Sequence, residues 1–385
     1  MRFFLFLQQM KTTLVKQTIE DKSVVWFSNT NQYVVLENKT AEIISQLNTD
    51  ISVEKISQHL ANEFQIELND ALGFVEQIQN EIYIPNTKKQ SSDLKDNTEY
   101  NLPSFAITKF YKINTFVFKV EYLSEFEEYL VHPKFSHLEI TETSDFNHNF
   151  QVFTQEDVTF LIIDNEFIGS WPRKEIHYFQ GKFSMYIVQY MHNKPEEDWM
   201  GIFHASGLGN DKKSLLLLGD SGNGKSTSLA ILQANGLTCL ADDFVPMDIE
   251  KQHVYTFPSA ISIKRNSLET LLPMYPELET TAEFHFKRLN KIVRFLPPKT
   301  NQPNYNLPCN DLVFIKYEKG SDLKFNKISK IEAFQQLIPD SWISDKISNV
   351  KVFLQWFANT NCYKLTYSNN DKMVKTIKNL LNNDL

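Results

Sequence analysis

The sequence is poor in cysteine and in long apolar runs. Its three cysteines, Cys239, Cys309 and Cys362, are scattered along 385 residues. A dispersed, odd-numbered set forms no disulfide framework, and the lack of C-x-x-C and H-E-x-x-H excludes the common zinc patterns. These features favour a reducing compartment, so we expect a cytoplasmic protein. Phe3–Leu7 is shorter than the roughly 7–15 apolar residues of a signal peptide core, and no run approaches the about 20 apolar residues of a membrane span, so no membrane partner is expected.

The rest of the composition is that of a folded, acidic protein. Hydrophobic residues make up 42% of the chain, enough for sizeable cores in two or three domains. The net charge of −8 argues against nucleic acid as the main partner. Glycine is also scarce, with 11 residues, yet Gly219, Gly222 and Gly224 fall within six positions. This cluster singles out one segment for closer analysis.

Residues 1–85 are expected to form a small winged-helix-like α+β domain. Two short apolar runs, Ser23–Ser28 and Gln32–Glu37, flank turn residues and predict a β-hairpin. Three helices are predicted after it, a short one at Thr40–Leu47 and two with apolar stripes at Val53–Phe64 and Ala71–Ile82. Asn69 or Asp70 is placed to cap the last of them. The polar, aromatic-free stretch that follows predicts a linker over residues 86–99.

The remaining chain changes character near residue 200. Residues 100–200 are rich in Phe, Tyr and Val in short runs, which predicts a β-rich region with a possible helix after Lys182. Residues 201–385 alternate strands and helices, the pattern of an α/β domain. Within these regions we expect strands at Thr115–Val120, Thr159–Ile163, Leu312–Tyr317 and Cys362–Tyr367, and a closing helix at Asp371–Leu381.

A phosphate-binding loop is the strongest motif in the chain. A predicted strand, Ser214–Leu218, precedes a full match to G-x-x-x-x-G-K-[ST], and a helix is expected to start at Lys225. Glycines let the backbone turn around phosphate oxygens, and the helix N-terminus adds positive potential. Lys225 should reach the terminal phosphates of ATP and Ser226 should ligate Mg²⁺. The expected nucleotide-binding residues are Gly219, Asp220, Ser221, Gly222, Asn223, Gly224, Lys225, Ser226 and Thr227.

Two adjacent carboxylates follow the next predicted strand. Gly236 is placed to end the helix, and Leu237–Ala241 is a short apolar run that leads directly into Asp242 and Asp243. Carboxylates at the end of a strand that follows a phosphate loop suit metal binding and proton acceptance. An ordinary surface turn is the alternative interpretation of the pair.

The stretch from His204 to Val245, which ends in LADDFV, resembles the HPr kinase/phosphorylase family. The resemblance rests on a histidine, a strand, the phosphate loop, a helix and a strand that ends in A-D-D. It implies an α/β P-loop kinase in which Asp242 is the general base, Asp243 helps to position metal or substrate, and His204 lines the site. It also implies that residues 100–200 are the N-terminal lobe of that kinase.

One part of the family pattern is missing. The family's metal-binding glutamate beside R-G-L-G is replaced by Phe257–Ser259 and Ile261–Lys264. Neither a second metal ligand nor the reverse, phosphate-removing activity therefore follows from the resemblance. A cation should neutralise the charge of the transferred phosphoryl group, and the candidates are Lys264, Arg265, Arg288 and Arg294.

Residues 23–85 resemble the PqqD-like peptide-recognition domain, in the order of their elements and in the phrase YVVLENKTAEIISQL. Such domains bind the leader of a ribosomally made precursor peptide as an added strand. Together the two resemblances imply a kinase that phosphorylates a Ser or Thr of a captured precursor peptide, with ATP and Mg²⁺. The alternatives are a kinase of a carrier protein or of a small alcohol such as free serine, and a nucleotide-gated binding module without catalysis. The oligomeric state stays open, with a homo-oligomer among the possibilities.

Overall fold

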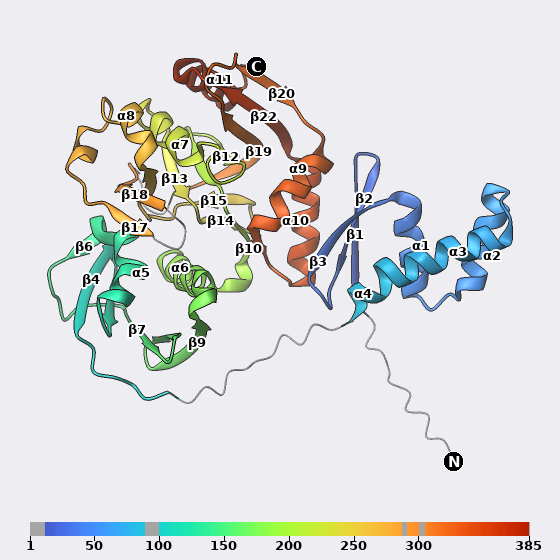
Figure 1. Ribbon diagram of the computed structural model, residues 1–385, viewed down its shortest axis with the longest axis horizontal. Helices are drawn as coiled ribbons and strands as arrows, with labels where there is room; N and C mark the ends of the chain where they lie inside the picture. The colour runs from blue at the N-terminus through green and yellow to red at the C-terminus, as the bar shows by residue number, and fades with distance from the viewer. Residues whose placement is uncertain (1–11, 89–99, 287–290, 300–304, 385) are drawn as a thin grey trace. The chain divides into compact units, whose positions relative to one another are not determined.

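The computed structural model describes residues 12–88, 100–286, 291–299 and 305–384 (Figure 1). The chain is multidomain, with mixed α/β content and several sheets. It divides into two compact units that are both discontinuous in sequence. The first unit comprises Met1–Asp93, Ser329–Ile338 and Asp345–Asn359, and the second comprises Leu94–Ile328, Pro339–Ser344 and Thr360–Leu385.

The first unit begins with a three-stranded antiparallel sheet in the order β1-β2-β3. Its core forms between this sheet and the helices that follow, which confirms the expected hairpin and the three expected helices. The additional strand β1 was not predicted. The elements are β1 (Leu14–Ile19), β2 (Lys22–Phe27), β3 (Gln32–Glu37), α1 (Asn38–Asn48), α2 (Val53–Phe64) and α3 (Leu68–Ile78), then a π-helical turn at Gln79–Tyr83 and α4 (Ile84–Thr87).

Two boundary expectations in this unit need correction. Helix α3 starts at Leu68 after Glu67, so neither Asn69 nor Asp70 caps it, and Asp70 instead lies in the first turn, where its charge suits the helix dipole. The expected linker at residues 86–99 begins too early, because α4 folds back onto the turn between β2 and β3. Asn29 Nδ2 donates to the carbonyl oxygen of Thr87 at 2.8 Å. The rest of that linker, residues 89–99, lies outside the described residues.

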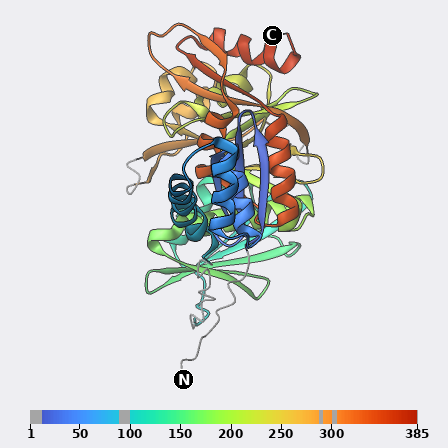
Figure 2. The same cartoon turned by 90° about the vertical axis from the view of Figure 1, so that its right-hand side faces the viewer.

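Helices α9 (Lys330–Leu337) and α10 (Ile347–Asn359) also belong to this first unit, although they fall within the range expected for the α/β domain. Side chains alternate along β3, so Val34 and Leu36 face α1–α3 whereas Tyr33 faces the other way. The ring of Tyr33 packs edge-on against Phe334 and Phe353, with centroids 5.9 and 5.7 Å apart. Figure 2 shows the orange-red α10 on one side of the blue strands and the blue helices on the other. The small sheet is therefore covered on both faces.

The second unit contains a six-stranded sheet in the order β6-β4-β5-β7-β8-β9, which confirms the β-rich character of residues 100–200. Helices α5 (Glu125–Phe135) and α6 (Ile176–His192) pack on it. Helix α5 was not predicted, and α6 starts before Lys182. The strands are β4 (Ile107–Ile113), β5 (Phe116–Tyr122), β6 (Glu139–Ile140), β7 (His148–Gln155), β8 (Val158–Ile163) and β9 (Glu166–Pro172).

The same unit contains a ten-stranded mixed sheet in the order β13-β11-β12-β19-β15-β14-β10-β21, with β22 beside β19 and β20 beside β22. Its strands are β10 (Trp199–Phe203), β11 (Ser206–Gly209), β12 (Ser214–Leu218), β13 (Thr238–Asp242), β14 (Val245–Asp248), β15 (His253–Tyr255), β19 (Asn306–Tyr317), β20 (Lys324–Lys327), β21 (Ser341–Ile343) and β22 (Asn361–Tyr367). A smaller sheet, β16-β18-β17, is made of β16 (Ile261–Lys264), β17 (Phe284–Phe286) and β18 (Lys291–Leu296). The unit also holds α7 (Lys225–Ala234), α8 (Leu268–Leu271) and α11 (Asn370–Asn382).

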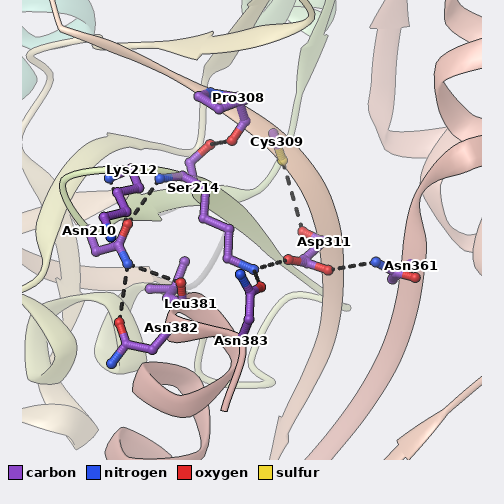
Figure 3. Close-up of polar contacts among 11 residues, drawn as sticks. Asn210, Lys212, Ser214, Pro308, Cys309, Asp311, Asn361, Leu381, Asn382 and Asn383 are labelled. Carbon is purple, nitrogen blue, oxygen red and sulfur yellow. Dashed lines mark hydrogen bonds and ion pairs between the residues drawn. The ribbon is translucent and has the colours of Figure 1, made fainter. Parts of the chain in front are cut away.

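Strands β12, β19 and β22 run parallel at the centre of the large sheet. A polar cluster holds their N-terminal halves together (Figure 3). The buried carboxylate of Asp311 contacts Lys213 Nζ at 3.1 Å and accepts from Asn361 Nδ2 at 3.0 Å. Because parallel strands end at one edge, this register pairs Leu218 with Phe314 and places the C-terminal ends of β12 and β19 at the opposite edge of the sheet, where ligands of α/β proteins bind.

In the described part of the chain, no helix is both long and apolar enough to cross a bilayer.

Candidate functional site

The phosphate-loop motif lies between a buried strand and a helix. Strand β12 ends at Leu218 and α7 starts at Lys225, as expected. Gly219, Gly222 and Gly224 have φ of +128°, +101° and +95°, a region that favours glycine. A Cβ atom at Gly219 would lie 2.9 Å from the carbonyl oxygen of Ile315, whereas none of the described atoms comes within 4 Å of one at Gly222. The glycines are therefore needed for the turn and leave the tip of the loop open.

The loop surrounds the ammonium group of Lys225. This side chain is only 7% exposed, and its Nζ donates to the carbonyl oxygen of Gly219 and, at 3.4 Å, to that of Asp220. Burial lowers the pKa of Lys225, and the carboxylates of Asp243 and Asp242 oppose that shift. The ammonium group thus occupies a cradle of oxygen atoms in which phosphate oxygens could take the place of carbonyls.

Most of the expected nucleotide-binding residues line a single cavity of about 160 Å³ over this loop. Gly219 and Asn223 do not line it; instead Asn223 accepts a hydrogen bond from the N–H of Tyr317 at 3.0 Å, which anchors the loop to β19. Thr227 contacts Ser267 through its hydroxyl at 2.8 Å. The lining residues from the motif are Asp220, Ser221, Gly222, Gly224, Lys225, Ser226 and Thr227.

The two aspartates differ in their surroundings. Asp242 ends β13 and is 3% exposed. Its Oδ1 accepts a hydrogen bond from Ser206 Oγ at 2.6 Å, and the hydroxyl of Ser226 lies close enough to its carboxylate to favour the ionised form and lower the pKa. Burial, followed by the negative charge of Asp243, raises the pKa of Asp242 to about 6. Asp242 therefore belongs to the loop side of the site, next to the serine expected to bind the metal.

Asp243 instead faces open space. Its φ of +65° is in the left-handed region, and its side chain, 25% exposed, lines the loop cavity and a larger neighbouring one. Its carboxylate lies 4.0 Å from Lys134 Nζ and 3.9 Å from His204 Nδ1. Burial would raise the pKa of Asp243, but the positive charges of Lys134, His204, Lys291 and Lys225 hold it below its usual value. The carboxylate is thus kept ionised where a ligand can reach it.

His204 lies where the sequence places it, beside the aspartates. The ring Nδ1 of His204 is 3.3 Å from the carbonyl oxygen of Asp243. The backbone N–H of His204 donates to the carbonyl oxygen of Asp340 at 3.3 Å. The imidazole is 42% exposed and lines both cavities.

The four candidate cations differ in their position relative to the phosphate loop. Lys264 is at the site, with Nζ 3.4 Å from Ser221 Oγ. Arg265 and Arg294 both form ion pairs with the carboxylate of Glu283, and neither lines the cavity over the phosphate loop. Arg288 lies outside the described residues.

Three further residues of the site were not found from the sequence. Ser206 on β11 and Lys134 on α5 contact the aspartates, and the positive charge of Lys291 at the start of β18 lies near enough to lower the pKa of Asp243. They come from elements far apart in the chain, and none lies in a recognisable motif. Tertiary packing alone brings them together.

A magnesium ion would have suitable oxygen ligands here. Within the described residues, no group of three or more His, Cys, Asp or Glu side chains is placed to hold a metal. Mg²⁺ does not need such a cage, because it retains waters and binds one or two protein oxygens plus substrate phosphates. The hydroxyl of Ser226 and the carboxylate of Asp242 are adjacent and meet that requirement.

The chain matches no family model and no curated protein.

Proposed function

We propose that this protein is an ATP-dependent kinase that phosphorylates a Ser or Thr hydroxyl of a ribosomally synthesised precursor peptide. The observation that carries the proposal is the convergence on one cavity of the phosphate loop with Lys225 and of the ionised carboxylate of Asp243. A nucleotide phosphate chain and a proton acceptor would then face each other across a short distance. This arrangement is what transfer to a hydroxyl requires.

The loop side of the site binds the nucleotide. Lys225 would contact the terminal phosphates, and Ser226 together with Asp242 would hold Mg²⁺. The metal, when bound, neutralises negative charge on the phosphates. Lys264, next to Ser221, is placed to stabilise charge on the transferred group.

Asp243 is the general base for the acceptor hydroxyl. The hydroxyl oxygen of the acceptor bonds to the terminal phosphorus, and the bond from that phosphorus to its bridging oxygen breaks. ADP leaves with the electron pair, and the hydroxyl proton passes to the Asp243 carboxylate. Geometry is the first requirement for a general base, and Asp243 faces the cavities whereas Asp242 is enclosed by Ser206 and Ser226. This division of roles reverses the one implied by the family resemblance.

The first unit captures the leader of the peptide. Strand β3 is at one end of its sheet and pairs with β2 alone among the described strands. An edge strand offers unpaired N–H and C=O groups to an incoming strand. A captured leader raises the local concentration of the core segment at the kinase site, so weak recognition of the core suffices.

Cys239, Cys309 and Cys362 are buried and form no disulfide with one another, which is compatible with a cytoplasmic location, and we include that location in the proposal.

The test is a transfer assay with Mg-ATP and three acceptors, in which mass spectrometry detects the gain of one phosphoryl group. The acceptors are a full-length precursor peptide encoded beside the gene, the same peptide without its leader, and free serine. We expect phosphorylation of the full-length peptide, a slower reaction without the leader, and none with Lys225→Ala. Equal rates with and without the leader would refute leader capture. Reaction of free serine alone would identify a small-alcohol kinase, and ATP binding without any transfer would identify a binding module.

A further inference from the structure

Beside the phosphate loop lies a larger cavity of about 670 Å³ whose charges are unbalanced. Its lining contains the cationic side chains of Lys134, Lys264, Arg265 and Lys291 but a single carboxylate, that of Asp243. Glu283 neutralises Arg265 from outside the cavity. The three lysines remain, and they come from α5, β16 and β18.

This grouping of lysines is unfavourable in the free protein. Burial lowers the pKa of Lys291 in spite of the attraction of Asp243, and the charges of Lys134 and Lys264 lower it further. Neither Lys264 nor Lys291 forms an ion pair with any residue of the described ranges. Like charges brought together and partly desolvated destabilise a fold unless an anion joins them.

The phosphates of a bound nucleotide would neutralise only part of this positive charge. Lys264 and Lys291 line both the loop cavity and the larger one, so they are within reach of a phosphate chain. Lys134 lines the larger cavity and not the loop cavity. It therefore lies on the side from which the acceptor approaches, 4.0 Å from the carboxylate of Asp243.

We propose that the larger cavity binds an anionic group of the acceptor, a carboxylate or a phosphate adjacent to the reacting hydroxyl, and that Lys134 and Lys291 select for it. This inference rests on the proposed kinase function and adds its substrate class. A hydroxyl at Asp243 leaves a neighbouring anion beside Lys134, while Phe286 and Phe295 line the wall for apolar parts of the acceptor. The volume is in the range of about 300–1,000 Å³ typical of ligand pockets.

The experiment compares short serine peptides in matched pairs that differ by one anion. One pair has a C-terminal serine as free acid or amide, one has Asp or Asn next to the serine, and one has phosphoserine or serine next to it. Initial rates with Mg-ATP give kcat and KM for the wild type, Lys134→Gln, Lys291→Gln and the control Lys174→Gln, whose side chain is 76% exposed.

We expect the anionic member of at least one pair to have a KM about tenfold or more below its neutral partner, as a charged hydrogen bond provides. The pair that shows this difference in KM identifies the source of the anion. Lys134→Gln should remove this preference with little change in the KM for ATP, and Lys174→Gln should retain it. Equal KM values within all three pairs would overturn the proposal, as would a Lys134→Gln variant that loses ATP affinity and both acceptors equally.

A binding measurement separates this inference from the kinase proposal. The same peptides are titrated by calorimetry into protein saturated with Mg²⁺ and a non-hydrolysable ATP analogue. Selective binding of the anionic peptides without turnover would support the anion site and refute the kinase. Turnover of all peptides without selectivity would support the kinase and refute the anion site.

Discussion

Ser206 Oγ donates a 2.6 Å hydrogen bond to Asp242 Oδ1, and both side chains are buried. The two residues face each other across the antiparallel pair β11–β13. The peptide N–H of Ser262 approaches the other carboxylate oxygen at 3.4 Å. The carboxylate of Asp242 is thus fixed in place by contacts from two neighbouring strands, β11 and β16.

This buried carboxylate makes stability depend on pH. The pKa of Asp242 is about 6 in the folded protein against 3.8 for the free side chain, so ionisation disfavours the fold. The destabilisation is absent below pH 3.8, where the carboxyl group is protonated in both states. It develops as the pH rises from 3.8 to about 6 and is complete above about pH 6. Without nucleotide and Mg²⁺, Asp242→Asn should therefore raise the free energy of unfolding at pH 8 by roughly 1–3 kcal/mol. Urea titrations of both proteins at pH 5 and pH 8 should show a smaller gain at pH 5. An equal gain at both values would contradict the assignment.

Substitutions of the two aspartates should affect different steps, transfer for Asp243 and Mg-ATP binding for Asp242. Asp243→Asn removes the carboxylate that faces the acceptor, so transfer should fall about 10²–10⁴-fold, while Mg-ATP binding changes little. Asp242→Asn should weaken the binding of ATP in the presence of Mg²⁺ more than in EDTA. Calorimetry and single-turnover rates measure the two effects. If Asp242→Asn abolishes transfer with normal Mg-ATP binding, Asp242 is the base, as the family resemblance implies.

The features that could be predicted from the sequence are those encoded by neighbouring residues. The phosphate loop, β12 before it and α7 after it depend on a contiguous motif, so Gly219–Ser226 could be located without a structure. Helix α5 was missed because Pro133 lies inside it and its buried residues form no clear stripe. Lys134 on that helix was missed with it. Its role depends on a contact with Asp243 that no local pattern encodes.

Local sequence patterns also could not predict which segments of the chain make up the first unit, because its segments are held together by long-range contacts. The helical patterns of α1–α3 identify a small domain, but that α9 and α10 complete it depends on contacts of Tyr33 with Phe334 and Phe353. Those partners lie some three hundred residues away in the chain. Only the folded structure reveals such a pairing.

Lys225→Ala should weaken Mg-ATP binding by about 10–100-fold, because charge-assisted hydrogen bonds to phosphate contribute roughly 1.5–3 kcal/mol. Ser226→Ala should act mainly through the metal, so its effect should shrink when EDTA is present. Lys212→Ala is the matched control: Lys212 is exposed and lies with the polar cluster near the start of β12, away from the loop (Figure 3). Calorimetric titration of ATP measures all three. An unchanged affinity in Lys225→Ala would exclude the loop as the nucleotide site.

Phe353→Ala should destabilise the first unit. Phe353 is fully buried and packs against Tyr33 and Phe334, so its loss leaves a cavity that costs about 3–5 kcal/mol. Hydrogen exchange should accelerate in β1–β3, whereas amides of β12 and α7 in the second unit should keep their protection. Phe64→Ala is the control, since this ring on α2 is 54% exposed and its removal should change stability by no more than about 0.5 kcal/mol. Similar exchange in the two variants would argue against the packing of α10 on the sheet.

A fragment of residues 1–93 should not fold stably by itself, although it contains the whole segment that resembles a peptide-recognition domain. It lacks α9 and α10, so the face of the sheet that carries Tyr33 would be exposed to water. It also lacks Ser329 and Lys330, whose hydroxyl and N–H bind the carboxylate of Glu20 at 2.7 and 3.0 Å. Circular dichroism and urea unfolding should show a less cooperative, less stable fragment than the full chain. Adding a peptide of residues 329–359 in trans should restore part of the stability, because it resupplies both helices. A fragment that unfolds cooperatively and is as stable as β1–β3 in the full chain would show that α9 and α10 are not needed for the fold of the first unit.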